Sequence, residues 1–355
     1  MRILFISLAK QGFYDAYVHR IASLRSGLES LGAKTVMLYL GDMPLKKPFL
    51  ISPVNVPIMR KYFDGFDYIH AGNTGAAYLM SLAKMTRKTD AKIIYDVHGN
   101  LAEEAKLNNR GWFDLRNSFH YLQYSMMEKI AAKHSDYFAV CSGSFRDHYV
   151  RSGVDRERIE VVLNGVNVDL FKPGHTERND VFTIASGFRN REGIAQLLEV
   201  ARLLKDQKVR IRVIGLKATA RKALEGQYGN IEFMDFRSLT ELIDHMRSSD
   251  GLIIPGMRHQ APEAFPGKFA EYIACGVPVI VTDAGDAGLT RRHRCGLVCD
   301  DSAASVAAAI LKLKNYRCEE RQEMGENGRR LAEDLLDYRK ISKNYYQFLK
   351  DASHS

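Results

Sequence analysis

Short apolar runs of strand length alternate with longer amphipathic segments along the first half of the chain. The strand-length runs are Arg2–Leu8, Lys34–Leu40, Asp67–Ala71, Lys92–Val97 and Asp136–Ser142. The helical segments between them are Tyr14–Leu31, Thr74–Thr86, Ser118–Lys133 and Ser144–Ser152. The strands are apolar on both faces instead of alternating, which is typical of parallel strands covered by helices on each side. The pattern predicts a doubly wound α/β domain.

A second series of the same kind follows in the other half. Its predicted strands are Val181–Ser186, Val209–Gly215, Ile231–Met234, Gly251–Pro255, Val277–Val281 and Cys295–Cys299. Its predicted helices are Ile194–Leu204, Lys217–Gln227, Leu239–Arg247, Lys268–Cys275, Ser302–Leu313 and Glu319–Leu335. A chain of 355 residues is too long for one ordinary core, so two such domains are expected. The proline-rich segment Asp42–Tyr62 is expected to be irregular.

Composition indicates the cellular compartment and the kind of partner to expect. The five cysteines are odd in number and scattered, no apolar run reaches membrane-spanning length, and the first residues enter a strand without a signal peptide. We therefore expect a cytoplasmic protein. The net charge of +9 is compatible with nucleic acid, a phosphorylated substrate or anionic lipid. No nucleic-acid recognition pattern is present, which favours an anionic substrate and peripheral contact with the inner face of a membrane.

The segment from Glu263 to Val281 carries the strongest chemical signal. Glu263 and Glu271 flank a Pro-Gly turn, and a helix is expected from about Gly267 to Cys275. The amino end of such a helix offers free N–H groups to an anion, and Lys268 adds a positive charge there. Glu271, one turn further on, could accept hydrogen bonds from two sugar hydroxyls. Spacing alone equally allows an ordinary amphipathic helix with solvated charges.

The wording of this stretch, Glu-Ala-Phe-Pro-Gly-Lys-Phe-Ala-Glu followed by Cys-Gly-Val-Pro-Val-Ile, resembles the donor-binding signature of retaining glycosyltransferases of family 4. These enzymes have the GT-B fold, in which two Rossmann-like doubly wound domains face an interdomain cleft. The resemblance implies that Glu271 binds the nucleotide ribose and Glu263 lies against the donor sugar. It implies further donor contacts at Ala264, Phe265, Gly267 and Lys268. Pro266 departs from the common pattern, which has a residue with an N–H at that place.

In the first half, one further motif fits the same family and one loop departs from it. Asp96-Val-His98-Gly-Asn100 follows a predicted strand, and ligands of open α/β sheets bind at the carboxyl ends of strands. A histidine there can be purely structural, but the resemblance implies that His98 contacts the donor sugar. The first loop contains only Gly12 where relatives often carry a glycine pair near the substrates.

The stretch Asn164–Pro173 matches the segment that crosses between domains in family 4. We therefore expect an N-terminal, acceptor-side domain at residues 1–168 and a C-terminal nucleotide-sugar domain at residues 169–335. Residues 336–355 are expected to form a helix that crosses back to the first domain.

The second half departs from the family in one loop. Relatives hold the donor diphosphate with an Arg and a Lys five residues apart, and the matching positions here are Gly187 and Glu192. Arg189 and Arg191 lie in the same loop, and guanidinium groups pair well with phosphate. Gly215 ends a predicted strand at a nucleotide-facing turn. The resemblance places the base near Asp235 and Phe236, largely through backbone.

The main hypothesis is a retaining glycosyltransferase of the hexosyltransferase type. It would move a sugar from a nucleotide-diphosphate sugar to a glycan or lipid-linked acceptor, as in cell-surface polysaccharide or glycolipid synthesis. No Asp-x-Asp suited to bridging a metal is seen, so we expect no metal and no cofactor besides the co-substrate. A nucleotide-sugar epimerase would transform the donor without an acceptor. A catalytically silent GT-B scaffold would bind the donor without turnover. The absence of the family's Arg and Lys at positions 187 and 192 keeps that alternative open.

Overall fold

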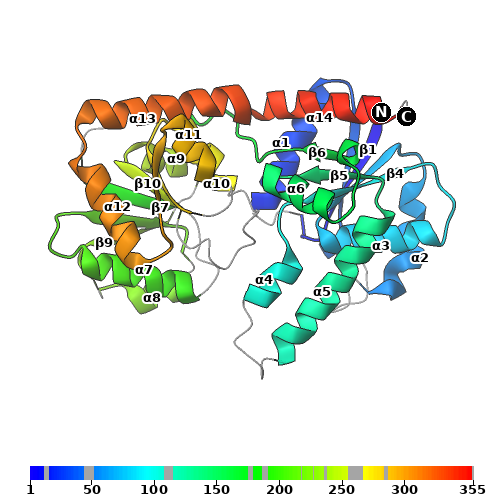
Figure 1. The fold of residues 1–355 in the computed structure, drawn as a ribbon, viewed down its shortest axis with the longest axis horizontal. Helices are drawn as coiled ribbons and strands as arrows, with labels where there is room; N and C mark the ends of the chain where they lie inside the picture. Colours follow the sequence, from blue (N-terminus) through cyan, green and yellow to red (C-terminus); the bar gives the residue numbers. More distant parts are fainter. Residues whose placement is uncertain are drawn as a thin grey trace. The chain divides into compact units, whose positions relative to one another are not determined.

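The computed structural model describes most of the chain as two separate units (Figure 1). The described residues are 1–11, 16–43, 52–107, 115–174, 179–185, 191–216, 218–226, 228–235, 238–254, 267–283 and 287–353. One unit holds Met1–Gly165 together with the C-terminal segment from Tyr338. The other holds the described residues between Val166 and Asp337. Each unit is built around its own parallel sheet.

The first unit contains a six-stranded sheet in the order β2-β1-β3-β4-β5-β6, and all neighbours are parallel. The strands are β1 (Arg2–Ser7), β2 (Lys34–Tyr39), β3 (Tyr68–Gly72), β4 (Lys92–Val97), β5 (Tyr137–Val140) and β6 (Ile159–Val161). The main helices are α1 (Ala16–Ser30), α3 (Thr74–Met85), α4 (Leu101–Leu107), α5 (Leu115–His134), α6 (Gly143–Arg151) and α14 (Tyr338–Ala352). The predicted doubly wound arrangement is confirmed.

The C-terminal helix α14 completes the core of the first unit. Ile341, Tyr345 and Leu349 are buried with residues of β1 and α1 in one apolar cluster. The backbones of α1 and α14 approach so closely that a Cβ atom at Gly27 would lie 2.1 Å from Ser342 Oγ. Glycine is therefore the residue that lets this helix pair pack.

The second unit contains six parallel strands in the order β12-β11-β10-β7-β8-β9. The strands are β7 (Val181–Ala185), β8 (Arg210–Ile214), β9 (Ile231–Met234), β10 (Gly251–Ile254), β11 (Val279–Thr282) and β12 (Gly296–Cys299). The helices are α7 (Arg191–Leu203), α8 (Ala218–Leu224), α9 (Leu239–Arg247), α10 (Gly267–Ala274), α11 (Ala287–His293), α12 (Ala303–Asn315) and α13 (Cys318–Leu331). The strand order reverses between β7 and β10, which makes their carboxyl ends the place where this kind of sheet binds ligands.

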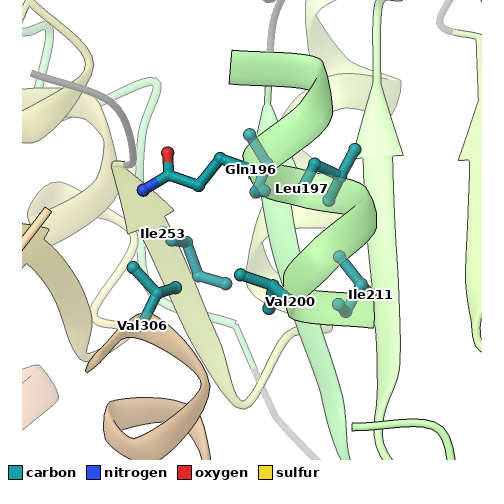
Figure 2. A pocket seen from close by; sticks show the side chains of 7 residues that line it. Gln196, Leu197, Val200, Ile211, Ile253 and Val306 are labelled. Atoms are coloured by element: carbon teal, nitrogen blue, oxygen red, sulfur yellow. The ribbon is translucent and has the colours of Figure 1, made fainter. Parts of the chain in front are cut away.

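The core of the second unit contains a small apolar void. Leu197 and Val200 of α7 face Ile211, Ile253 and Val306 around a void of about 10 Å³ (Figure 2). The lining is apolar except for Gln196, whose amide donates to Asp301 Oδ1 at 3.0 Å. A void of this size holds at most one water molecule, so this void is too small to be a ligand site.

Two expectations from the sequence were incomplete. The proline-rich segment contains short helical turns, including α2 (Val56–Met59), because proline is well accepted in the first turn of a helix. The helix α4 was not predicted, although Asn100 precedes it as an N-cap whose Oδ1 accepts the N–H of Glu103 at 3.0 Å.

We expect Gly27→Ala to lower the free energy of unfolding by about 2 kcal/mol, because the added methyl forces α1 and α14 apart. Urea denaturation measures this. The control is Gly288→Ala in α11, where a Cβ atom would meet only the Arg292 guanidinium, at 3.4 Å, and little stability should be lost. The double variant Gly27→Ala/Ser342→Gly should recover much of the loss. An unchanged unfolding curve for Gly27→Ala would contradict the close helix contact.

Candidate functional site

The predicted site residues are only partly within the described chain. Outside the described residues lie Gly12, Arg189, Phe236, Glu263, Ala264 and Phe265. Within them lie His98, Arg191, Gly215, Asp235, Gly267, Lys268 and Glu271. His98 belongs to the first unit and the other six belong to the second, so each group is considered by itself.

Helix α10 presents three predicted residues on one face. Gly267, Lys268 and Glu271 are half-buried, whereas Phe269, Ala270, Tyr272, Ile273 and Ala274 are buried. The helix begins with Gly267 on the carboxyl-end side of the sheet, since it connects β10 to the parallel strand β11. Its first N–H groups and the positive end of its dipole are therefore at the edge where a ligand would bind.

The Glu271 carboxyl group is electrostatically unusual. Its removal from water raises its pKa to about 7, and the Lys268 ammonium one turn earlier acts in the opposite direction. Glu271 is thus poised between a neutral acid and a carboxylate near neutral pH. In its charged form, two oxygens could accept hydrogen bonds from a pair of hydroxyls.

The place of α10 is fixed by a contact that the sequence analysis missed. The Tyr272 hydroxyl accepts the Ala185 N–H at 2.9 Å and donates to the Ala185 carbonyl oxygen at 3.1 Å. Ala185 is the last residue of β7, so the phenol binds α10 to the end of the strand at the reversal of the sheet. From the sequence, the position of Tyr272 in the predicted helix indicates only packing against the core, not a hydrogen bond to the backbone.

The remaining described residues of the second unit also follow the carboxyl ends of strands. Arg191 is the first residue of α7, after β7. Gly215 follows β8 with a φ of 77°, and its N–H donates to Met234 O at 3.1 Å. Asp235 follows β9, where its exposed carboxylate accepts from Arg221 of α8 at 2.6 Å. The Asp235 side chain is thus engaged within the protein.

In the first unit, His98 follows β4 and is half-buried, at the start of a turn that leads into α4. Two residues earlier, Asp96 is fully buried and its Oδ1 accepts from Arg20 Nη2 at 2.9 Å. Arg20 also donates to the carbonyl oxygens of Val162 at 2.7 Å and Leu163 at 3.0 Å. This ion pair therefore ties α1, the end of β4 and the segment after β6 together.

Burial and the neighbouring positive groups shift the pKa of Asp96 in opposite directions. Burial alone raises the pKa of this carboxyl group, but the Arg20 guanidinium, His70 and His98 outweigh it, and the pKa lies below its ordinary value. The fully buried His70 of β3 has its pKa lowered to about 4, because desolvation dominates over the attraction of Asp96. His70 is thus neutral near pH 7 and interacts with the ionised carboxylate of Asp96.

Within the described part of the chain, no group of three or more His, Cys, Asp or Glu side chains could hold a metal ion. Likewise, none of the described helices is both long and apolar enough to cross a membrane.

Two parallel α/β units in series, with polar residues after their strands, are the arrangement of the GT-B fold. Two family models match consecutive parts of the chain: Glycosyltransferase Family 4 over residues 9–170 and Glycosyl transferases group 1 over residues 167–331. The chain belongs to this glycosyltransferase family. The predicted fold class is confirmed.

Solved structures agree on the fold. A sucrose-phosphate synthase from Thermosynechococcus elongatus is 17% identical with a TM-score of 0.79, covering 99% of each chain. HepE from Anabaena, in complex with UDP and glucose, is 16% identical with a TM-score of 0.72, also covering 99% of each. The apo lipopolysaccharide outer core galactosyltransferase WaaB is 15% identical with a TM-score of 0.67, covering 99% of this chain and 100% of that one. No curated protein sequence matches the chain.

We expect the free energy of unfolding to depend on pH through Glu271. Between pH 4.5 and about 7 the folded state keeps a proton that the unfolded state has lost, so stability falls as pH rises through this range. Glu271→Gln removes the effect, and its stability relative to wild type should rise by about 2 kcal/mol over that range. Urea denaturation from pH 4.5 to 8 measures it. Parallel pH profiles for the two proteins would show that the carboxyl group titrates normally.

Proposed function

We propose that the protein transfers a sugar from a nucleotide-diphosphate sugar to an acceptor hydroxyl, with retention of anomeric configuration. The observation that carries the proposal is α10, whose first turn, with Lys268 in it and Glu271 one turn further on, begins at the carboxyl edge of the second sheet. That arrangement suits a diphosphate next to a ribose. Family membership supports glycosyl transfer as the chemistry.

The reaction breaks the bond between the anomeric carbon and the diphosphate oxygen, and the nucleoside diphosphate leaves with the electron pair. The acceptor oxygen bonds to the anomeric carbon and loses its proton to the leaving phosphate or to water. Negative charge grows on the diphosphate in the transition state, where the α10 amides and Lys268 would stabilise it. In this proposal Glu271 binds the ribose hydroxyls and His98 faces the donor sugar.

Several proposed roles belong to residues outside the described chain, and one belongs to Arg191, which lies within it. Glu263 would lie against the donor sugar, Arg189 and Arg191 would supply the phosphate charges that relatives obtain from an Arg and a Lys, and Phe236 would lie near the base. The proposed chemistry needs no metal, because cationic side chains and helix amides supply the positive charge. A UDP-type donor is supported by HepE, whose structure contains UDP and glucose.

The acceptor is proposed to be a glycan or lipid-linked glycan at an anionic membrane surface. Helix α5 supports this through an outward row at spacings of three and four residues. Phe119, Leu122 and Met126 are 65%, 66% and 52% exposed, and Lys129 and Lys133 continue the row as exposed cations. Apolar side chains followed by lysines suit the acyl boundary and the phosphates of a lipid surface.

The nucleotide site is tested by thermal denaturation and calorimetric titration with UDP, GDP, ADP and their sugars. One nucleotide family should raise the melting temperature by about 5 °C at saturating concentration, since binding to the folded state alone stabilises it. Glu271→Ala should abolish the shift, whereas Glu319→Ala, on an exposed part of α13, should preserve it. Binding without sugar release to any acceptor would favour a silent scaffold, and epimerised donor would favour an epimerase. No shift with any nucleotide would contradict the proposal.

The membrane contact is tested by cosedimentation with phosphatidylglycerol vesicles. Phe119→Ser/Leu122→Ser should weaken binding at least about tenfold, because two large apolar side chains are lost from the contact. The control Leu203→Ser/Leu335→Ser changes two exposed leucines elsewhere, 39% and 42% exposed, and should bind as wild type does. Equal binding of both variants, or equal binding to phosphatidylcholine, would rule out this face.

A further inference from the structure

Arg329 of α13 holds three carbonyl groups that belong to separate parts of the second unit. Its Nη1 donates to Phe171 O at 2.6 Å and to Ala274 O at 2.9 Å. Its Nη2 donates to Val168 O at 2.9 Å, and its Nε is paired with Glu333 Oε1 at 2.7 Å. The side chain is only 16% exposed, so the fork of the guanidinium is fully used within the protein.

One of these acceptors has a special place, because Ala274 is the last residue of α10. The final carbonyl groups of a helix have no partner within the helix and carry the negative end of its dipole. A guanidinium at this end both satisfies such a carbonyl and stabilises the helix electrostatically. Arg329 therefore acts on α10 from the end opposite to the proposed anion site.

Close backbone contact makes this reach feasible. A Cβ atom at Gly325 would lie 2.1 Å from Gly276 O, immediately after α10, and one at Gly328 would lie 3.1 Å from Ile273 Cβ. The two glycines thus let α13 lie directly against the carboxyl end of α10. Arg329 then forms a polar contact where the two backbones meet.

Helix α10 is consequently held at two points along its length. Tyr272 attaches its middle to Ala185 at the end of β7, and Arg329 attaches its last carbonyl to α13. A rigid helix pinned at two points has a defined direction, so these contacts also fix where Gly267 and Lys268 lie. The eight residues of α10 span about 12 Å.

We propose that Arg329 is a positioning residue for the donor site: by holding the carboxyl end of α10, it places the amides, Lys268 and Glu271 that bind the nucleotide diphosphate. This inference rests on the proposed function insofar as α10 binds the donor. Arg329 itself contacts no substrate in this scheme. Its effect on binding is transmitted along the helix.

The competing explanation is that Arg329 only stabilises the fold, and Arg321 provides a matched control on the same helix. Arg321 is buried and pairs with Asp250 Oδ1, while Asp250 Oδ2 accepts the N–H groups of Asn179 and Val181 at 3.1 Å each. These contacts lie at the amino ends of β7 and β10, away from α10. Loss of either arginine should lower stability, but only loss of Arg329 should disturb the donor site.

The experiment compares Arg329→Met, Arg329→Lys and Arg321→Met by hydrogen exchange and by calorimetric titration with UDP. Arg329→Met should accelerate amide exchange throughout α10 and weaken UDP binding about tenfold, with the number of binding sites unchanged. Arg329→Lys keeps one cation without the fork and should give a smaller loss. Arg321→Met should keep the wild-type dissociation constant in its folded fraction, because a purely structural defect reduces only the number of active molecules.

Equal behaviour of Arg329→Met and Arg321→Met, in exchange of α10 and in UDP affinity, would overturn the inference. If Arg329→Met does not fold, Arg329→Lys decides: wild-type affinity and wild-type exchange in α10 would then reject a positioning role. If the wild-type protein itself binds no UDP, the proposed uridine-nucleotide donor site is wrong. Exchange in α10 still decides whether Arg329 holds the helix, so the two failures are distinguishable.

Discussion

Parallel strand pairing is the constraint on which the rest of this structure depends. When every strand of a sheet runs the same way, all connections that follow the strands emerge at one edge, and the helices must return across the faces. The chemistry-bearing residues Arg191, Gly215, Asp235 and Gly267 therefore gather at one edge of the second sheet, although more than seventy positions separate the first from the last. His98 occupies the equivalent edge of the first sheet.

Buried polar side chains inside each unit fix helices to the ends of strands at this edge. The phenol of Tyr272 and the guanidinium of Arg20 both join a helix to the end of a strand through backbone or carboxylate oxygens. Buried polar groups are costly unless they are hydrogen-bonded, and both of these side chains form hydrogen bonds within their unit. These bonds also fix the ends of the strands from which the following loops start.

The fold could be predicted from the sequence because apolar strand runs alternate with helical spacing at nearly constant intervals. The strand Lys92–Val97 and the helix Leu239–Arg247 have the predicted bounds. The contacts that hold α10 could not be predicted, since the sequence alone does not distinguish Tyr272 and Arg329 from other helix residues. Their hydrogen-bond acceptors are the backbone carbonyl oxygens of Ala185 and Val168, and the pattern of side chains does not predict bonds to the backbone. The raised pKa of Glu271 likewise follows from burial, which spacing alone does not reveal.

The last helix has a consequence for how the protein is made. Tyr345 and Leu349 of α14 belong to the same apolar cluster as Ile3 and Phe5 of β1, so β1 can complete its packing only after α14, far later in the sequence, has been synthesised. During synthesis that part of the first unit's core would stay exposed while the second unit, whose described residues all precede α14 in the chain, can already close. Synthesis of the first unit thus begins before that of the second unit and is completed after it. Its apolar core is the surface that a molecular chaperone would cover in the meantime.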